Sequence, residues 1–257
     1  MDTFEASAAS HVRSEPAILY FGTPVVLLST INPDGTANLA PISSIFWLGW
    51  RAILGISTNG QTVPNLRRTA EIVLNLPSAE MVDNVDRLAL TTGTQDVPEA
   101  KRDRGYHFLA GKFQRAGLTP LASETVTPPR VAECPVVMEA VVEAIHDVAE
   151  DDAVQAGQLV TVEVRVQRVL VHPNVLVEGK PNRIDPDTWR PLIMLFSHFY
   201  GLTDSQLRPS TLAGIDESLY RGPDIDRGRT NDLTPAHEPA VQSAHEFSAA
   251  MAQTCMT

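Results

Sequence analysis

The sequence predicts a mainly β domain with short helices (α+β), closed into a barrel or a split barrel, and three observations support this class. Short apolar, β-branched runs alternate with loops rich in Ser, Thr, Asn and Gly. The run 159–171 places valine at every second position over most of its length, which is typical of a half-buried strand. The sequence lacks the regular strand–helix alternation of a parallel doubly wound sheet. With about six or seven strands, a barrel is the economical fold because it removes exposed edges.

The first two strands are predicted to form a hairpin. Residues 25–31 are almost continuously apolar, and residues 36–40 return as a second strand. Between them Pro33 presets φ and Gly35 accepts a positive φ, so residues 32–35 make a tight turn. The remaining predicted strands are 52–57, 72–76, 136–145 and 159–171.

The last two of these strands are expected to pair antiparallel across an acidic loop. Valines face one way from Val160 to Val166, after which the phase slips to Val169 and Val171. One extra residue near Gln167–Arg168 would produce this slip, so a β-bulge is predicted there.

Two helices are predicted between the strands. Ser78 is a candidate N-cap of a helix that runs to Leu88 and packs an apolar stripe on the barrel. A second short helix is expected around residues 98–104, where the basic residues, among them Lys101, are interpreted as a solvated face.

The chain is divided into three parts. Residues 1–16 are predicted to be an N-terminal arm, residues 17–202 the barrel domain and residues 203–257 a C-terminal extension. Within the extension, residues 239–251 could form a terminal helix. The extension either wraps a partner subunit or is a loosely held tail.

Composition and charge exclude several function classes. With 20 Lys+Arg against 31 Asp+Glu, the chain has a net charge of −11 and lacks the basic footprint that nucleic acid binding requires. No apolar run is long enough to span a membrane, and the polar first residues hold no secretory signal core. The two cysteines, Cys134 and Cys255, form no CxxC pair, which favours a reducing, cytoplasmic setting.

Common catalytic motifs are missing from the sequence. No GxGxxG follows a strand, no HExxH offers a zinc site and no GxSxG elbow occurs. Residues 105–113 have a faint likeness to a P-loop, but the spacing is too long and Phe113 stands where Ser or Thr must bind magnesium. No metal site is predicted, and nothing points to a dispersed Ser–His–Asp triad.

Residues 57–62 form a candidate phosphate site. The run Ser-Thr-Asn-Gly-Gln-Thr places hydroxyls and amides just before a short helix predicted over residues 63–68, with Thr62 as the candidate N-cap. A helix start offers free N–H groups and partial positive charge, to which Arg67 and Arg68 could add. A capped surface loop explains the same pattern equally well.

Many short sequence words occur in order over residues 17–202, among them GTPVVLLST, DGTANLAPISSIFW, QTVPNL, EIVLNLPS, PPRVAECPVVMEA and HFYGL. Together they resemble the flavin reductase family, whose fold is an FMN-binding split β-barrel. The resemblance implies a homodimer with each flavin near the subunit interface. It also implies reduction of FMN by NADH or NADPH, or use of reduced FMN on another acceptor.

The resemblance assigns FMN-binding roles to individual positions. Ser57 and Thr62 match the hydroxyls expected at the FMN phosphate, with Asn65 nearby. The residues expected beside the isoalloxazine ring are Asn38, Pro41, Ile42, Ser43 and Ser44. Each has a structural alternative: the two serines could simply end a strand, and Asn38 could hold a turn.

His198 and Tyr200 are the catalytic candidates, assigned to the open face of the flavin where a nicotinamide or another substrate stacks. A purely structural role explains His198 at least as well. Phe46, Trp47 and Trp50 could wall the ring, although aromatic residues at that spacing are more typical of a core or a dimer interface.

Three functions fit these expectations. FMN carries the redox chemistry on its own ring, so the protein needs no acid–base cluster. The first function is an NAD(P)H:flavin oxidoreductase that supplies reduced FMN to a partner monooxygenase. The second is an FMN-dependent enzyme that acts directly on an organic substrate, and the third is a flavin-binding electron carrier without nicotinamide activity.

Overall fold

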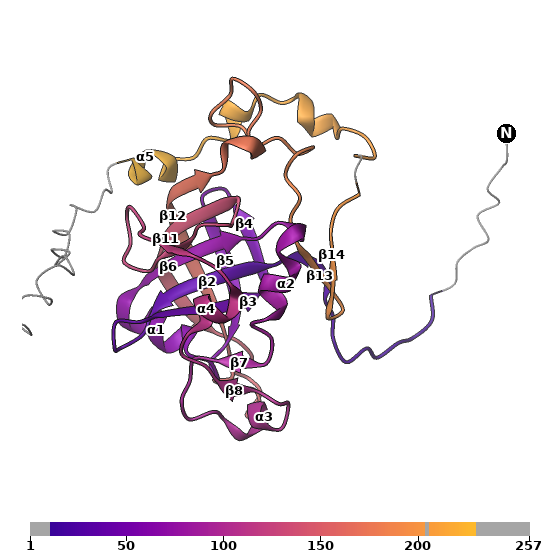
Figure 1. Ribbon diagram of the computed structural model, residues 1–257. Coiled ribbons are helices and arrows are strands. Elements are labelled where there is room, and N and C mark those ends of the chain that lie inside the picture. The colour runs from indigo at the N-terminus through magenta and orange to yellow at the C-terminus, as the bar shows by residue number, and fades with distance from the viewer. Residues whose placement is uncertain (1–10, 204–205, 230–257) are drawn as a thin grey trace, which may run out of the picture.

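The structure is a computed structural model that describes residues 11–203 and 206–229. The helix predicted over residues 239–251 and most of the predicted N-terminal arm lie outside these ranges. The centre of the molecule is an antiparallel seven-stranded sheet, curled into a barrel (Figure 1). In sheet order its strands are β3 (Ala37–Ile42), β2 (Val26–Ile31), β6 (Glu71–Leu76), β11 (Val136–Asp147), β12 (Leu159–Val171), β5 (Arg51–Ser57) and β4 (Ile45–Leu48). The predicted mainly β fold with short helices is therefore confirmed.

The remaining elements surround this barrel. Strands β1, β13 and β14 form a separate small sheet at one side, and α3, β7 and β8 lie together at the lower end of the view in Figure 1. These and the other elements are β1 (Phe21–Pro24), α1 (Thr62–Thr69), η1 (Ala79–Met81), α2 (Val82–Asp86), β7 (Thr91–Thr92), α3 (Glu99–Arg102), β8 (His107–Phe108), α4 (Lys112–Ala116), β9 (Pro120–Leu121), β10 (Arg130–Val131), η2 (Pro173–Val175), β13 (Ile193–Leu195), β14 (His198–Tyr200), η3 (Thr211–Gly214), η4 (Glu217–Tyr220) and α5 (Asp224–Gly228).

Two apolar clusters hold the barrel together. One fills its interior, where the alternating residues Val160, Val162 and Val164 of β12 are fully buried. The other lies on the outer face of the sheet, where Leu27 and Val73 pack in a cluster with residues of α2 and α4. The period of two in the strands thus supplies both clusters from one sheet.

The predicted hairpin and the predicted bulge are both confirmed. β2 pairs with β3 around the expected turn, in which Gly35 has a φ of +82°. β11 pairs antiparallel with β12, and their register skips Gln167 between Val166 and Arg168. The extra residue shifts the side-chain phase at the position where the valine pattern slips.

The helix predicted over residues 78–88 is interrupted. Ser78 makes no capping hydrogen bond, because its backbone is tied by a β-bridge to Pro191 and the chain first forms the single turn η1. α2 then follows. Met81, Val85 and Leu88 are buried in the outer cluster, so the expected apolar stripe is confirmed.

Candidate functional site

The loop between β5 and α1 is the centre of the candidate site. It runs from Ser57, the last residue of β5, to Thr62, the first residue of α1. The predicted helix is confirmed, but the prediction that Thr62 is its N-cap is wrong. Gln61 holds that position with helical backbone angles, and the Thr62 hydroxyl turns inward to accept a hydrogen bond from Asn38 Nδ2 at 3.4 Å. The helix start therefore has no side-chain cap, which leaves its first N–H groups for another acceptor.

Asn65 fastens this loop to the barrel. Its side chain is fully buried, and its Nδ2 donates to Thr30 Oγ1 and Asn32 Oδ1 at 3.0 Å each. Its Oδ1 accepts from Gln61 Nε2, also at 3.0 Å. Because all its polar atoms have partners inside the protein, Asn65 shapes the loop rather than offering a free group to a ligand.

Asn38 differs from Asn65 because one of its polar atoms has no partner. It is 2% exposed on β3, and its Nδ2 makes only long hydrogen bonds of 3.4 Å to Thr30 and Thr62. Its Oδ1 is buried without any hydrogen bond, facing Gly93, where an added Cβ would lie 2.5 Å away. A buried acceptor left unpaired is unfavourable, so this oxygen fits a donor supplied by a ligand.

The segment between β6 and β11 brings Lys101 to this loop and Lys112 into the electrostatic range of Lys101. Lys101 on α3 places its Nζ 3.4 Å from the position of a Cβ built at Gly60. Lys112, the first residue of α4, is only 3% exposed. In the described ranges neither ammonium has a carboxylate partner, since the ion pairs found there are made by arginines. The interpretation of Lys101 as part of a solvated face is therefore wrong, because the insertion folds back over the loop.

The charged forms of the two ammonium groups are disfavoured by burial and by nearby positive charge, and a bound anion would stabilise them. Burial lowers the pKa of Lys101, and the charge of Arg104 lowers it further. Burial lowers the pKa of Lys112 to about 8, with a further contribution from the charge of Lys101. Buried charges are normally paired, so two like charges without a carboxylate indicate an anion site. Ammonium groups, hydroxyls and helix N–H groups together are the donor set that a phosphate monoester prefers.

The predicted ring-side residues follow one edge of the barrel toward the gap between its two edge strands. Asn38, Pro41 and Ile42 lie on β3, and Ser43 and Ser44 link β3 to β4. The carbonyl oxygen of Ser44 accepts the N–H of Gly55 at 2.8 Å. A Cβ built at Gly55 would lie 3.1 Å from the Ser44 Cβ, so the link runs close to β5.

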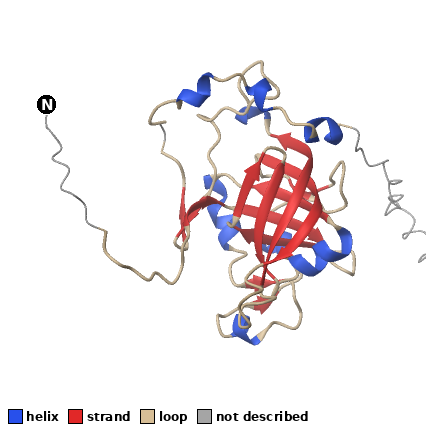
Figure 2. Ribbon diagram, turned by 180° about the vertical axis from the view of Figure 1, so that it is seen from behind, coloured by secondary structure: helices blue, strands red, loops and turns tan. Residues whose placement is uncertain are grey.

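His198 and Tyr200 do not join this site within one chain. Both are exposed on β14. The small sheet that contains β14 lies on the opposite side of the barrel from α1 in both ribbon views (Figures 1 and 2). These side chains would reach a flavin bound at the loop only if a second copy of the chain brought them there.

Sequence reasoning missed Lys112, Gly93 and Thr94, whose hydroxyl is buried without a partner. The sequence holds one signal for Lys112. The chain has three lysines, and two of them, Lys101 and Lys112, fall in the one polar insertion. The small number of lysines does not show that Lys112 is buried, because its burial depends on how the insertion folds.

The described residues also bear on two other kinds of feature, groups that could hold a metal ion and helices that could cross a membrane. Within residues 11–203 and 206–229, no group of three or more His, Cys, Asp or Glu is placed to hold a metal ion. Cys134 is buried among apolar side chains, and burial raises the pKa of its thiol. In the same ranges, no helix has the length and apolar character needed to cross a membrane.

Comparisons with known proteins place this chain in a family. The flavin reductase like domain matches residues 18–203. A Bacillus subtilis (strain 168) protein described as uncharacterized protein YdfE is 37% identical over 202 residues, covering 79% of this chain and 94% of the relative. The chain belongs to the flavin reductase like family, a family of flavin-binding proteins.

Solved structures show the same fold. The flavoredoxin of Desulfovibrio vulgaris (Miyazaki F) superimposes with a TM-score of 0.61 at 18% identity, covering 79% of this chain and all of the flavoredoxin (100%). Nitrilotriacetate monooxygenase component B from Bacillus cereus gives a TM-score of 0.59 at 20% identity, covering 74% of this chain and 88% of that protein. The barrel described above is therefore the split barrel of flavin reductases.

Proposed function

We propose that this protein is an FMN-dependent NAD(P)H:flavin oxidoreductase that works as a cytoplasmic homodimer and supplies reduced FMN to a partner monooxygenase. The observation that carries the proposal is a pair of neighbouring lysines without a carboxylate partner among the described residues: Lys101, whose Nζ reaches the loop at Gly60, and the buried Lys112, on which the charge of Lys101 acts. Membership of the flavin reductase like family supports flavin as the source of the missing anion. The likeness in fold to a monooxygenase component B supports the choice of partner.

The residues at the loop fit the phosphate end of FMN. Lys112 and Lys101 would neutralise the phosphate, while the hydroxyls of Ser57 and Thr62 and the first N–H groups of α1 would bond its oxygens. Such a cradle favours a phosphate monoester over uncharged riboflavin, because two ammonium groups need a full counter-charge.

The ring of the flavin would lie along β3 and the link to β4. There the residues Asn38, Pro41, Ile42, Ser43 and Ser44 offer backbone groups and one unpaired side-chain oxygen to its polar edge. When bound, the flavin accepts hydride from NADH or NADPH and passes electrons on, and the protein contributes binding and orientation. In a homodimer, His198 and Tyr200 of the partner subunit would flank the open face.

The experiment begins with the visible absorption spectrum of the purified protein, with FMN added if needed. Anaerobic mixing with NADH and then NADPH follows. We expect the flavin band to bleach within seconds with at least one nicotinamide, and excess free FMN to be turned over.

Each alternative gives a different result. A bound flavin that neither nicotinamide bleaches would identify an electron carrier instead. Bleaching without turnover of free FMN would favour direct action on an organic substrate. A protein that takes up no FMN at micromolar concentration would overturn the whole proposal.

A further inference from the structure

The C-terminal segment 206–229 runs over the end of the barrel that lies away from α1 (Figure 1). Residues of this segment and of the barrel line a large hollow. Its volume is about 1460 Å³, and it opens between the tip of the β4–β5 hairpin, the end of β12, residues 176–184 and residues 213–229. Small-molecule pockets usually measure about 300–1,000 Å³, so this is an open groove with room for a ligand of ordinary size. The C-terminal segment lies beyond the residues matched by the family.

The groove is lined by apolar side chains that remain partly uncovered. Trp50, Val169 and Val171 come from the barrel. On the C-terminal wall, Ile215 is 40% exposed and Tyr220 is 62% exposed. Apolar surface of this kind, enclosed on several sides, favours an apolar or aromatic ligand body.

The C-terminal wall is held mainly at its last turn. Every described residue from 206 to 221 is exposed, whereas Gly228 in α5 is buried. A Cβ built at Gly228 would collide with the carbonyl oxygen of Gln167, the bulged residue of β12, and would lie 3.3 Å from the Trp50 ring. Only glycine permits this close approach, so the bulge and Gly228 together form a docking point.

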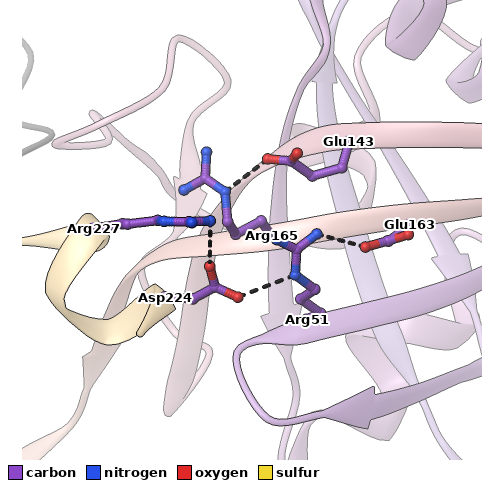
Figure 3. Close-up of polar contacts among 6 residues, drawn as sticks. All are labelled: Arg51, Glu143, Glu163, Arg165, Asp224 and Arg227. Atoms are coloured by element: carbon purple, nitrogen blue, oxygen red, sulfur yellow. Dashed lines mark hydrogen bonds and ion pairs between the residues drawn. The ribbon is translucent and has the colours of Figure 1, made fainter. Parts of the chain in front are cut away.

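Ion pairs fix the same turn to the barrel (Figure 3). Asp224 Oδ2 lies 3.1 Å from Arg51 Nε, and its Oδ1 lies 3.1 Å from an Arg227 guanidinium nitrogen. Arg51 is also paired with Glu163 at 2.6 Å. The side chain of Asp224 is only 14% exposed, which shows that α5 packs directly against the barrel.

The charges around the groove are mostly compensated, with two exceptions. Arg183 is paired with Glu217, and both Arg221 and Arg229 are paired with Asp226. Asp216 has no ion pair in the described ranges, but its carboxylate accepts the N–H of Ser218 at 2.8 Å. Lys180 at the rim has no carboxylate partner in the same ranges, so its ammonium group is available beside an apolar surface.

We infer that this groove is a second ligand site, separate from the flavin loop, and that it takes an organic anion with a flat apolar body. Trp50 and the apolar walls hold the body, and Lys180 holds the negative group. Gly228 and Asp224 keep the outer wall in place. The site does not depend on the proposed flavin chemistry.

Two fluorescent probes with the same aromatic body test this site. They are 1-anilinonaphthalene-8-sulfonate, which is an anion, and uncharged N-phenyl-1-naphthylamine, and each is titrated into the full chain with and without one equivalent of FMN, enough to fill the flavin loop. We expect saturable binding of the sulfonate at one site per chain that this amount of FMN does not displace. Lys180→Gln should weaken the sulfonate roughly threefold, the effect of one exposed charge, and leave the uncharged probe unchanged.

The wall is tested by a matched pair of glycine substitutions. Gly228→Val should weaken both probes at least tenfold, whereas Gly222→Val should not, because open space surrounds Gly222. Displacement of the sulfonate by FMN, or equal binding by both glycine variants, would overturn the inference. Lys180→Gln keeps the test decisive if Gly228→Val fails to fold: equal effects on the two probes, or none on either, would also reject the site.

Discussion

The two ends of the barrel use basic side chains in opposite ways. Near α5, Arg51 lies between Glu163 and Asp224, and these carboxylates raise the pKa of its guanidinium (Figure 3). At the loop before α1, Lys101 and Lys112 have lowered pKa values and no carboxylate within the described part of the chain. The forked guanidinium suits fixed pairs, while an ammonium group is a point charge that responds readily to its surroundings. A paired cation therefore marks structure here, and an unpaired buried cation marks a place where the counter-charge arrives with a ligand.

Removal of the buried lysine is expected to have the largest effect on FMN binding. Lys112→Met should weaken FMN binding by about 2–3 kcal/mol, roughly 30- to 150-fold in Kd, because the phosphate loses a charged donor in a dry site. Isothermal titration of FMN into the flavin-free protein measures this. Arg102→Met, which removes an exposed cation from the neighbouring helix α3, is the control and should change Kd less than twofold. Equal effects from both variants would mean that net charge, not position, matters.

The same lysine should make the flavin-free protein less stable at neutral pH than the Lys112→Met variant. The pKa of Lys112 is about 8 in the folded protein against an ordinary value of 10.5. Between these values the unfolded chain binds more protons, so stability rises with pH across this window, and below pH 8 the buried charge costs about 3 kcal/mol. Lys112→Met should recover most of that at pH 7 and flatten the rise. Urea unfolding at pH 7 and pH 10 checks this, and identical pH profiles for the two proteins would contradict it.

The hydroxyls of the loop should have effects no larger than that of the lysine. Thr62→Ala and Ser57→Ala should each weaken FMN binding by about 1–3 kcal/mol, the effect of an unpaired phosphate contact. Thr58→Ala is the matched control, because the Thr58 hydroxyl is already committed to Gly157 O at 2.7 Å. Unchanged affinity in both Ser57→Ala and Thr62→Ala, measured by fluorescence titration, would refute the phosphate assignment.

The arginine end should give the smallest effect. Asp224→Asn removes one carboxylate from Arg51 but leaves Glu163, so we expect a loss of no more than about 1 kcal/mol in unfolding free energy, as for a partly exposed pair. FMN affinity should not change. Asp226→Asn, in the same helix but with a 63% exposed side chain, is the control. A loss of FMN binding in Asp224→Asn would contradict the view that the arginine pairs near α5 are structural and take no part in flavin binding.

Six of the seven strands of the central sheet were predictable because their pattern is local, whereas the short edge strand β4 was not predicted. The slip between Val166 and Val169 predicts the bulge at Gln167, since an unbroken period of two would place Val169 and Val171 on the opposite face from Val160 to Val166. The turn before Gly35 is equally local. By contrast, nothing in the sequence around Gly228 shows that it will rest on that bulge, because this contact depends on where a long connection returns.

The candidate site was predictable only in part. The hydroxyl-rich loop was visible, but the inward turn of Thr62 depends on Asn38, which arrives from another strand. The burial of Lys112 depends on the insertion folding back onto the barrel. The strand that holds His198 and Tyr200 was not predicted, and their position relative to the loop could not be, because that relation involves the whole barrel and, in the proposed dimer, a second chain.

The scarcity of lysine gives this chain a built-in chemical reporter. Amines react with acylating reagents only as the free base, and Lys112, with a pKa of about 8, is partly deprotonated near neutral pH. A small amine-selective reagent that enters the loop would therefore modify Lys112 ahead of the exposed Lys180. Occupancy of the loop by a phosphate would restore the proton and shield the nitrogen, so the extent of labelling at one peptide would read out whether the site is filled.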